Sequence, residues 1–338
     1  MKNNCTWLLC LALIGYNQAL QAQDDCGQTL IQAERAYYTG RFGEVRTLLA
    51  TCLASGFDKD QKTEAYRLIA LSAIFSRNFE RADTSLLHML KNNPQYEFTP
   101  QDPPEFKKRV EHFKVHPLVE VTANLGVVQP FFKVNQVYNT RLLPAAVSYE
   151  GNTGVHIGLS ANYYFTKNIS ARVGYEWQHY SFTIQNEDSL NTGLLTEKES
   201  RSQWQLALGY SYNLKKFSLQ AYAGVAYATL QTADGYLVLN RNSSSDEIDF
   251  SYSTLPQRAK NQWRPLLELK VNLPQKDKWM FSLSVRYEFG IQNMTDADNR
   301  FSDPGRAATF EWIEDDFKSS TLLISFGISK LFYNVKLP

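Results

Sequence analysis

The part of the chain that follows His116-Pro117 alternates between apolar and polar residues with a period of two. In the stretch MFSLSVRYEFG, residues 280–290, every second position from Phe281 to Phe289 is apolar or aromatic, and the positions between them are Ser282, Ser284, Arg286 and Glu288. Segments of this kind begin near Leu118, Val155, Ile169, Gln203, Phe217, Trp263, Trp279 and Leu322. A period of two is that of a β-strand with one apolar face. The pattern therefore predicts eight strands.

This strand pattern fits both a soluble β-sandwich and a membrane β-barrel, and the lengths of the segments separate the two. Several segments run for about ten residues or more, which is enough for a tilted strand to cross a bilayer. The connections alternate between tight turns, at residues 166–168, 213–216 and 274–278, and long polar segments, at residues 129–154, 183–202, 229–262 and 292–320. Outer-membrane barrels have short periplasmic turns and long external loops. We therefore predict a closed, eight-stranded antiparallel transmembrane β-barrel over residues 115–338, with its long loops at the cell surface.

The same alternation divides the side chains of the predicted barrel between lipid and lumen. It directs the apolar face, for example Phe281 and Phe289, toward lipid. It directs charged residues of both signs into the lumen, namely Glu120, Arg172, Glu176, Arg264, Glu268, Lys270, Arg286 and Glu288. A ring of eight strands is just wide enough to be filled by side chains. We expect these residues to pair in a lumen charge network, which argues against a diffusion pore.

Between Gln28 and Phe113 the apolar period is helical, with breaks at Gly40, at Ser55-Gly56 and at Asn93-Pro94. The breaks predict two helix pairs within a domain of residues 23–114. The second pair resembles a tetratricopeptide repeat (TPR), and the packing residues that carry the resemblance are Tyr66, Ile69, Ala70, Ala73, Phe79, Ala82, Leu86 and Pro94. The resemblance implies a short helical stack whose concave face holds a partner peptide or protein. A spacer that binds nothing is the alternative.

The segment Asp102-Pro103-Pro104-Glu105-Phe106 follows the second helix pair. It supplies an N-cap, prolines suited to a first helical turn and an early acidic residue. The segment therefore predicts a further helix that caps the stack, with Asp102 as its N-cap.

The first 22 residues have the features of a cleaved signal peptide. Lys2 precedes a short apolar core from Trp7 to Ile14, and Leu20-Gln21-Ala22 forms a small-residue ending. The core is about half of the roughly twenty residues that a membrane-spanning helix needs. Export through this signal predicts that the helical domain lies in the periplasm of a Gram-negative bacterium.

Cys26 and Cys52 lie beyond the signal peptide and flank the first predicted helix pair. In an oxidising periplasm they are candidates for a disulfide. Two unpaired buried thiols are the alternative.

From Leu118 to Phe332 the chain resembles small outer-membrane barrels of the OmpA or OmpX type, and the PorT-like group. The strand from Leu322 to Tyr333 resembles the aromatic C-terminal signal that barrel-assembly machinery reads, although the chain continues to Pro338. The resemblance implies an outer-membrane location and a partner protein in secretion, motility or outer-membrane assembly machinery.

Composition and motifs exclude several classes of function. The formal net charge of +1 at pH 7 creates no field that attracts nucleic acid, so nucleic acid is not an expected partner. The sequence has no glycine loop for phosphate and no His/Cys cluster, and we expect neither a cofactor nor a metal. One candidate for catalysis is the pair His179 and Ser181, which resembles the His-x-Ser pair of lipid A hydrolases and in which the His would activate the Ser hydroxyl.

These patterns together favour a non-enzymatic outer-membrane barrel that anchors a periplasmic TPR-like interaction domain. Its expected partners are outer-membrane lipid and a periplasmic or outer-membrane protein bound by the helices. The alternatives are a lipid A-modifying hydrolase and a small-solute channel.

Overall fold

The computed structural model describes residues 25–138, 146–187, 191–214, 217–241, 247–274, 279–303 and 312–337. The predicted signal peptide therefore lies outside the described residues, as do parts of several predicted loops and turns. No helix in the described ranges is both long and apolar enough to cross a membrane. The chain divides into a helical unit, residues 1–116 with 333–338, and a barrel unit, Pro117–Phe332.

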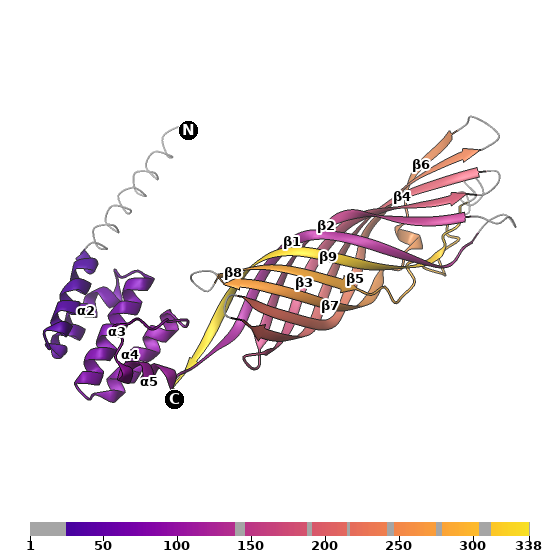
Figure 1. Cartoon of the computed structure of the whole chain (residues 1–338). Helices are drawn as coiled ribbons and strands as arrows, with labels where there is room; N and C mark the ends of the chain where they lie inside the picture. The colour runs from indigo at the N-terminus through magenta and orange to yellow at the C-terminus, as the bar shows by residue number, and fades with distance from the viewer. Residues whose placement is uncertain are drawn as a thin grey trace, which may run out of the picture. The chain divides into compact units, whose positions relative to one another are not determined.

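The helical unit is built from successive antiparallel helices (Figure 1). A helix through residues 25–38 is followed by α2 (Phe42–Ala54), α3 (Lys59–Phe75), α4 (Phe79–Asn92) and α5 (Pro104–Glu111). The alanines at the helix contacts are almost fully buried, namely Ala33, Ala36, Ala65, Ala70, Ala73 and Ala82. Because an alanine keeps two helix backbones close, these positions set the spacing of the stack.

Side chains next to the helix ends fix where α3 and α4 begin. Asp58 accepts a hydrogen bond from the backbone N–H of Gln61, and the Gln61 side chain accepts one from the N–H of Asp58, so the two form a capping box. Asn78 accepts from the N–H of Arg81 at the start of α4.

The predicted capping helix exists as α5, but the prediction that Asp102 is its N-cap is wrong. Pro103 occupies the N-cap position and makes no side-chain cap. Asp102 is buried, and its carboxylate accepts hydrogen bonds from Arg67, Tyr96 and the N–H of Thr99 instead. An ion pair to a buried arginine is a stronger interaction for a carboxylate than an exposed helix cap.

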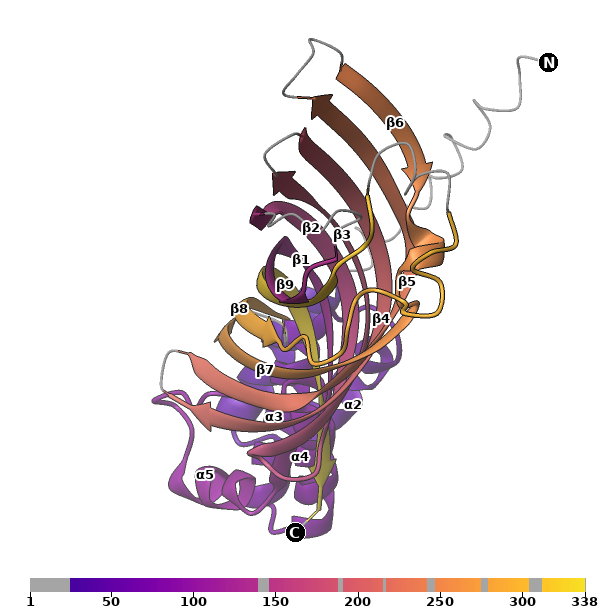
Figure 2. The ribbon, with the colours of Figure 1, turned by 90° about the vertical axis from the view of Figure 1, so that its right-hand side faces the viewer.

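The barrel unit is one antiparallel sheet that closes on itself (Figures 1 and 2). Its strands are β1 (Lys114–Gln136), β2 (Ala146–Tyr164), β3 (Ile169–Glu187), β4 (Asn191–Asn213), β5 (Ser218–Arg241), β6 (Glu247–Ser253), β7 (Asn261–Pro274), β8 (Trp279–Glu288) and β9 (Asp316–Lys336). The sheet order is β4-β3-β2-β1-β9-β8-β7-β5-β6, and a further pairing joins β4 to β5. This pairing closes a ring of eight strands, which confirms the predicted eight-stranded barrel.

Among the described residues, the predicted loops of residues 129–154, 183–202 and 229–262 are largely strand, and this corrects their predicted extent. In its described part, the predicted loop of residues 292–320 contains strand only from Asp316, where β9 begins. The pairing of β3 with β4 continues to Glu187 and Thr192, and that of β4 with β5 continues to Asn191 and Arg241. β6 lies inside the predicted loop of residues 229–262 and pairs with the end of β5 beyond the ring (Figure 2). The alternation of apolar and polar residues is weaker in these outer strand segments because they carry more polar residues.

The alternation of the strands separates an apolar outer face from a polar inner face. Outward side chains are exposed, for example Leu125 at 61%, Leu208 at 66% and Leu283 at 56% of their surface. Their neighbours along the strands are buried inside the ring, as Ser282, Ser284, Arg286 and Glu288 show for β8.

The last strand contributes to both units of the chain. Residues 333–338 are grouped with the helices, and Val335 packs in an apolar cluster with Phe106, Val110 and Phe113. The predicted domain boundary at residues 114 and 115 therefore lies two residues before the observed one, and the predicted barrel domain includes a segment that belongs to the helical unit.

Candidate functional site

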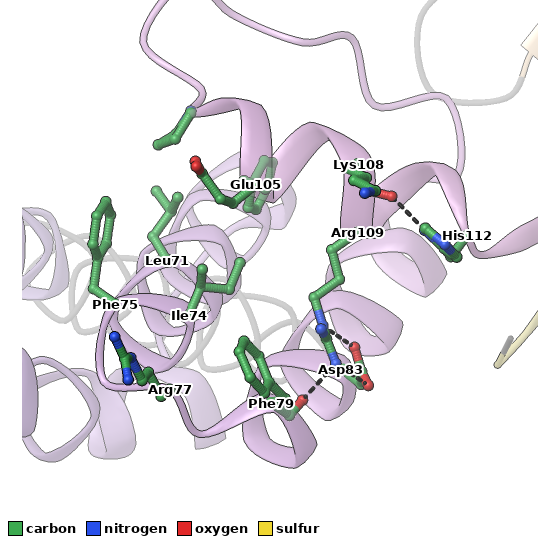
Figure 3. A pocket seen from close by; sticks show the side chains of 12 residues that line it. Leu71, Ile74, Phe75, Arg77, Phe79, Asp83, Glu105, Lys108, Arg109 and His112 are labelled. Carbon is green, nitrogen blue, oxygen red and sulfur yellow. Dashed lines mark hydrogen bonds and ion pairs between the residues drawn. The ribbon is translucent and has the colours of Figure 1, made fainter.

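The helical unit contains an open pocket of about 690 Å³ formed by the end of α3, the start of α4 and α5 (Figure 3). Its apolar lining consists of Leu71, Ile74, Phe75, Phe79, Pro103 and Phe106. A volume in this range with mainly apolar walls is typical of sites that bind a ligand or an anchoring side chain. We treat this pocket as the candidate site.

Two aromatic residues of the lining are largely exposed. Phe75 shows 51% and Phe79 shows 49% of its surface to solvent. Phe79, which the sequence predicts to be a TPR-like packing residue, keeps about half of its surface exposed because it is the first residue of α4 and faces the pocket. Burying such rings against a partner would release about 25 cal/mol for each Å² of apolar surface removed from water.

One wall of the pocket is a fixed ion pair. Arg109 donates to both carboxylate oxygens of Asp83, at 2.6 and 2.8 Å, and its guanidinium lies 4.7 Å from the ring centre of Phe79. The arginine therefore ties α5 to α4 and covers one face of the aromatic ring, as the dashed lines of Figure 3 show for the ion pair.

Two other cationic side chains line the pocket, Arg77 and Lys108. Arg77 lies beside Phe75, and Lys108 lies beside His112 at the other side of the lining (Figure 3). Both residues are exposed, and in the described part of the chain neither side chain has a hydrogen bond or an ion pair. The Nδ1 of His112 donates to the carbonyl oxygen of Lys108 at 2.5 Å, which involves the backbone of Lys108 only.

Arg77 has an unusual backbone conformation. Within the described ranges it is the one non-glycine residue with a positive φ, at 55°, and it follows the end of α3. The corresponding position after the first helix is Gly40, with a φ of 78°. The hydrogen bonds match as well, because Arg41 donates to Ala36 at 2.9 Å and Asn78 donates to Ala73 at 2.8 Å. Glycine is the usual residue at this position of a helix end, so arginine is strained there.

A buried polar network holds the segment that leads into α5. The Asp102 carboxylate lies 2.7 Å from Arg67 Nε, 2.9 Å from the Tyr96 hydroxyl and 2.7 Å from the Thr99 N–H. Burial acts to raise the pKa of Asp102, but the hydrogen bond from Thr99 and the bonds from Arg67 and Tyr96 outweigh it, so the pKa of Asp102 is lowered. The pKa of Tyr96 is raised, first by burial and then by its bond to Asp102.

The other predicted TPR-like packing residues lie between the helices. Ile69, Ala70, Ala73, Ala82, Leu86 and Pro94 are buried. Tyr66 is partly buried and stacks on His88 with ring centres 5.1 Å apart. The TPR-like character of the stack itself remains an expectation from the sequence.

Cys26 and Cys52 are joined by a disulfide and lie in an apolar cluster with Ala33, Leu49 and Phe57. The bond links the first helix to α2.

The lumen of the barrel is filled by ion pairs that connect strands across the ring. Lys270 lies 2.5 Å from Glu120, and Arg172 lies 2.7 Å from Glu268. Arg286 pairs with Glu176 on the far side of the ring, and Arg264 lies 3.7 Å from Glu288. All eight predicted lumen residues are therefore buried and brought into ion pairs. Such buried pairs commonly have a structural role, since an unpaired charge inside the ring is costly.

The barrel interior contains a second layer of ion pairs that the sequence analysis does not predict. Arg258 pairs with Glu197 and lies 2.8 Å from Glu314, and Arg201 lies 2.7 Å from Glu199. All five residues lie in segments that the sequence pattern predicts to be loops. A signal was present, because Glu197, Glu199 and Arg201 continue the alternation of the lumen-facing residues that follow them in β4.

An apolar cluster lies in the outer part of the barrel unit. It consists of Val128, Tyr180, Phe182, Ile184, Leu195, Leu237, Leu239, Met294, Trp312, Phe317 and Leu323. The inward positions of β3 therefore change from polar, at Gln178, to apolar at Phe182 and Ile184. The interior is thus packed by two charged layers and by this apolar cluster.

The candidate catalytic pair is not joined in the structure. His179 Nδ1 lies 2.9 Å from the hydroxyl of Ser200 on the neighbouring strand, and its ring stacks on Trp177. The hydroxyl of Ser181 accepts a hydrogen bond from Asn152 instead, at 3.4 Å. In the described residues no carboxylate is bonded to His179, so a group that would orient its ring as a base is not in place.

The acidic residues before and within β9 are engaged by other groups. Glu314 contacts Arg258, Asp315 accepts from Tyr149 at 3.0 Å, and Asp316 accepts from Arg300. Within the described ranges there is no group of three or more His, Cys, Asp or Glu residues placed to hold a metal ion.

Comparisons with known proteins give a similarity of fold. No protein-family model and no curated protein matches the chain. Among solved structures, Ail of Yersinia pestis in complex with the heparin analogue sucrose octasulfate is 12% identical over 63% of this chain and 99% of Ail, with a TM-score of 0.27. Outer membrane protein AlkL in lipid bilayers is 14% identical over 70% of this chain and 96% of AlkL, with a TM-score of 0.38.

The outer membrane protease OmpT from Escherichia coli is 11% identical over 65% of this chain and 98% of OmpT, with a TM-score of 0.32. At these identities and TM-scores, the similarity assigns no activity, ligand or partner to this chain.

Proposed function

We propose that this chain is a non-enzymatic outer-membrane β-barrel that anchors a periplasmic, TPR-like protein-interaction domain. Its role is that of a component or scaffold of envelope machinery, in secretion, motility or outer-membrane assembly. The observation that carries the proposal is a contrast between the two units. The barrel interior is packed with ion pairs and apolar side chains, whereas the helical unit has an open apolar pocket with exposed aromatic rings.

The surface of the ring supports a membrane location. Its outward side chains are apolar and exposed on successive strands, as Leu125, Leu208 and Leu283 are. A contiguous apolar surface of this kind is unfavourable in water and typical of a protein that contacts lipid. Closure of the ring leaves no unpaired strand edge within the eight strands, which a bilayer core requires.

Residues near one end of the strands resemble an interface anchor. Lys330 lies 5.1 Å from the ring of Trp279 and 5.9 Å from that of Phe332. Aromatic rings and long cationic side chains gather where a bilayer meets water. This end adjoins the short turns, which supports its placement toward the periplasm.

The packed interior supports an anchoring role over that of a small-solute channel. A solute would have to separate the pair of Lys270 with Glu120, the pairs of Arg286, and the apolar cluster around Phe182 and Phe317. Breaking one buried ion pair costs about 3–5 kcal/mol, so spontaneous opening is rare.

Site-directed crosslinking in living cells tests the proposal. A photoreactive amino acid replaces Glu105 at the pocket, and in a control it replaces Arg35, an exposed residue that does not line the pocket. We expect a reproducible protein adduct from position 105 that is missing from position 35, in a protein that shows a heat-modifiable gel shift. The absence of any adduct specific to position 105 would refute the proposed interaction role.

A further inference from the structure

We propose that the pocket between α3, α4 and α5 binds an extended segment of the partner protein in which an apolar or aromatic side chain is flanked by acidic residues on both sides. The apolar side chain enters the pocket, and the acidic residues meet Arg77 on one side and Lys108 on the other. This inference rests on the proposed function and adds the chemistry of the partner.

The lining is suited to an apolar anchor. Leu71, Ile74 and Phe106 supply the apolar surface between the two exposed rings of Phe75 and Phe79. The pocket volume of about 690 Å³ admits a large side chain together with part of its backbone. Binding energy at such sites is concentrated in a few buried anchors, and aromatic anchors are the most frequent.

The conformation of Arg77 indicates that its side chain has a function at this rim. The first helix ends at Gly40 with the same pattern of hydrogen bonds. A glycine can therefore adopt the left-handed conformation that this helix end requires without strain. Arg77 adopts the left-handed conformation at a cost to stability, and in the described part of the chain its guanidinium has no protein partner. Strained residues without a structural role are concentrated at binding sites.

The charges of the lining favour an acidic partner. Asp83 is neutralised by Arg109, which leaves Arg77 and Lys108 as cations and Glu105 as the remaining carboxylate. The two cations lie at opposite sides of the apolar lining, as Figure 3 shows. A free C-terminal carboxylate could satisfy one of them only, so we commit to an internal segment with acidic residues on both sides of its anchor.

Binding of synthetic peptides to the full-length protein in detergent tests the inference. The probes are three fluorescein-labelled, terminally blocked peptides: Ser-Glu-Asp-Phe-Leu-Asp-Glu-Ser, the same peptide with Lys at the four acidic positions, and the same peptide with Gly-Ser in place of Phe-Leu. Fluorescence anisotropy should show saturable binding of the first peptide. The other two should bind at least tenfold more weakly.

Variants assign the binding to the pocket and separate binding from stability. Arg77→Gly should weaken binding of the acidic peptide at least fivefold and, because it relieves strain, should raise the unfolding midpoint of the helices. Arg77→Lys keeps the charge and should bind within threefold of the parent, and so should the control Arg35→Gln away from the pocket. A loss of binding in Arg77→Gly together with a more stable helical unit cannot be explained by misfolding.

Two results would overturn the inference: equal binding of the acidic and basic peptides, or binding by Arg77→Gly that equals that of the parent. Repeating the crosslinking from position 105 in the Arg77→Gly background separates this failure from that of the proposed function. An undiminished adduct would show that a partner binds without acidic recognition. Peptide binding without any cellular adduct would instead contradict the interaction role while leaving the pocket chemistry intact.

Discussion

Replacement of Asp102 by Asn should strongly destabilise the helical unit. Its carboxylate accepts from Arg67 at 2.7 Å, from Thr99 at 2.7 Å and from Tyr96 at 2.9 Å. The amide oxygen of an asparagine can still accept the hydrogen bond from Thr99. The side chain has no negative charge, however, and its NH₂ group would face the donors of Arg67 and Tyr96. Among the described residues, the other ion-pair partner of Arg67 is Glu64, whose side chain is 38% exposed.

The cost can be worked out from these contacts. A hydrogen bond to a charged group contributes about 1.5–3 kcal/mol, and removing one partner leaves the other desolvated. Because the side chains of Arg67 and Asp102 are almost inaccessible to water, solvent screens this pair little. We therefore expect the free energy of unfolding of the helical unit to fall by about 3 kcal/mol in Asp102→Asn. Glu64→Gln, at the exposed partner, should cost less than about 1 kcal/mol.

The chain offers separate optical signals for the two units. Every tryptophan among the described residues lies in the barrel unit, at positions 177, 204, 263, 279 and 312. Far-ultraviolet circular dichroism at 222 nm during urea titration in detergent therefore follows the helices, and tryptophan fluorescence follows the barrel. Asp102→Asn should shift the first transition and leave the second unchanged.

The dependence on pH follows from the lowered pKa of Asp102. A carboxyl group with a lower pKa in the folded state than in the unfolded state stabilises the fold above its unfolded pKa, and this contribution is lost as the pH falls through the folded pKa. The parent helices should thus lose stability in acid below about pH 4, and Asp102→Asn should lose less over that range. A variant as stable as the parent at neutral pH, or with the same acid response, would refute the reasoning.

Four further substitutions or treatments have definite expected outcomes. Reducing the disulfide between Cys26 and Cys52, which are 26 residues apart, should lower the stability of the helices by about 3.5 kcal/mol on the loop-entropy model, measured by urea titration with and without reductant. Ala82→Leu should cost about 1–3 kcal/mol by the same titration, because it inserts volume at a fully buried helix contact, whereas the exposed Arg35→Leu should change little. Neither the parent nor Arg286→Ala should conduct ions in planar bilayers, because the apolar cluster also packs the interior, and a steady current in either would restore the channel hypothesis. His179→Ala should leave the acyl pattern of lipid A unchanged in mass spectra of cells, and an altered pattern would restore the hydrolase hypothesis.

The strand pattern was readable from the sequence because it depends on nearest neighbours along the chain. Within a barrel strand each side chain faces lipid or lumen by parity alone, so Phe281 and Arg286 can be assigned without knowledge of the partner strands. The same parity extended to Glu197 and Glu199 would have placed them inside. The sequence pattern nevertheless predicts a loop there, because strand segments beyond the membrane no longer carry apolar residues at every second, outward-facing position.

The pocket could not be predicted, because it depends on how three helices meet. Phe79 has the spacing of a core residue, and only the distance between the start of α4 and α5 leaves its ring exposed. The role of Asp102 depends on Arg67, which is 35 residues away along the chain. Periodicity reports which face of an element is apolar, but not which partner covers it. The left-handed Arg77 is a similar case, since the sequence Ser-Arg-Asn-Phe carries no glycine to mark the turn.

The burial of Val335 among Phe106, Val110 and Phe113 has a consequence for biogenesis. Translation delivers the helices first and the strand that carries Val335 last, so the helical core stays incomplete until β9 arrives. The same strand pairs with β1 to close the ring. Completion of the helical unit is thereby timed to barrel closure, and a nascent chain halted before β9 would present an unfinished apolar surface to chaperones and proteases.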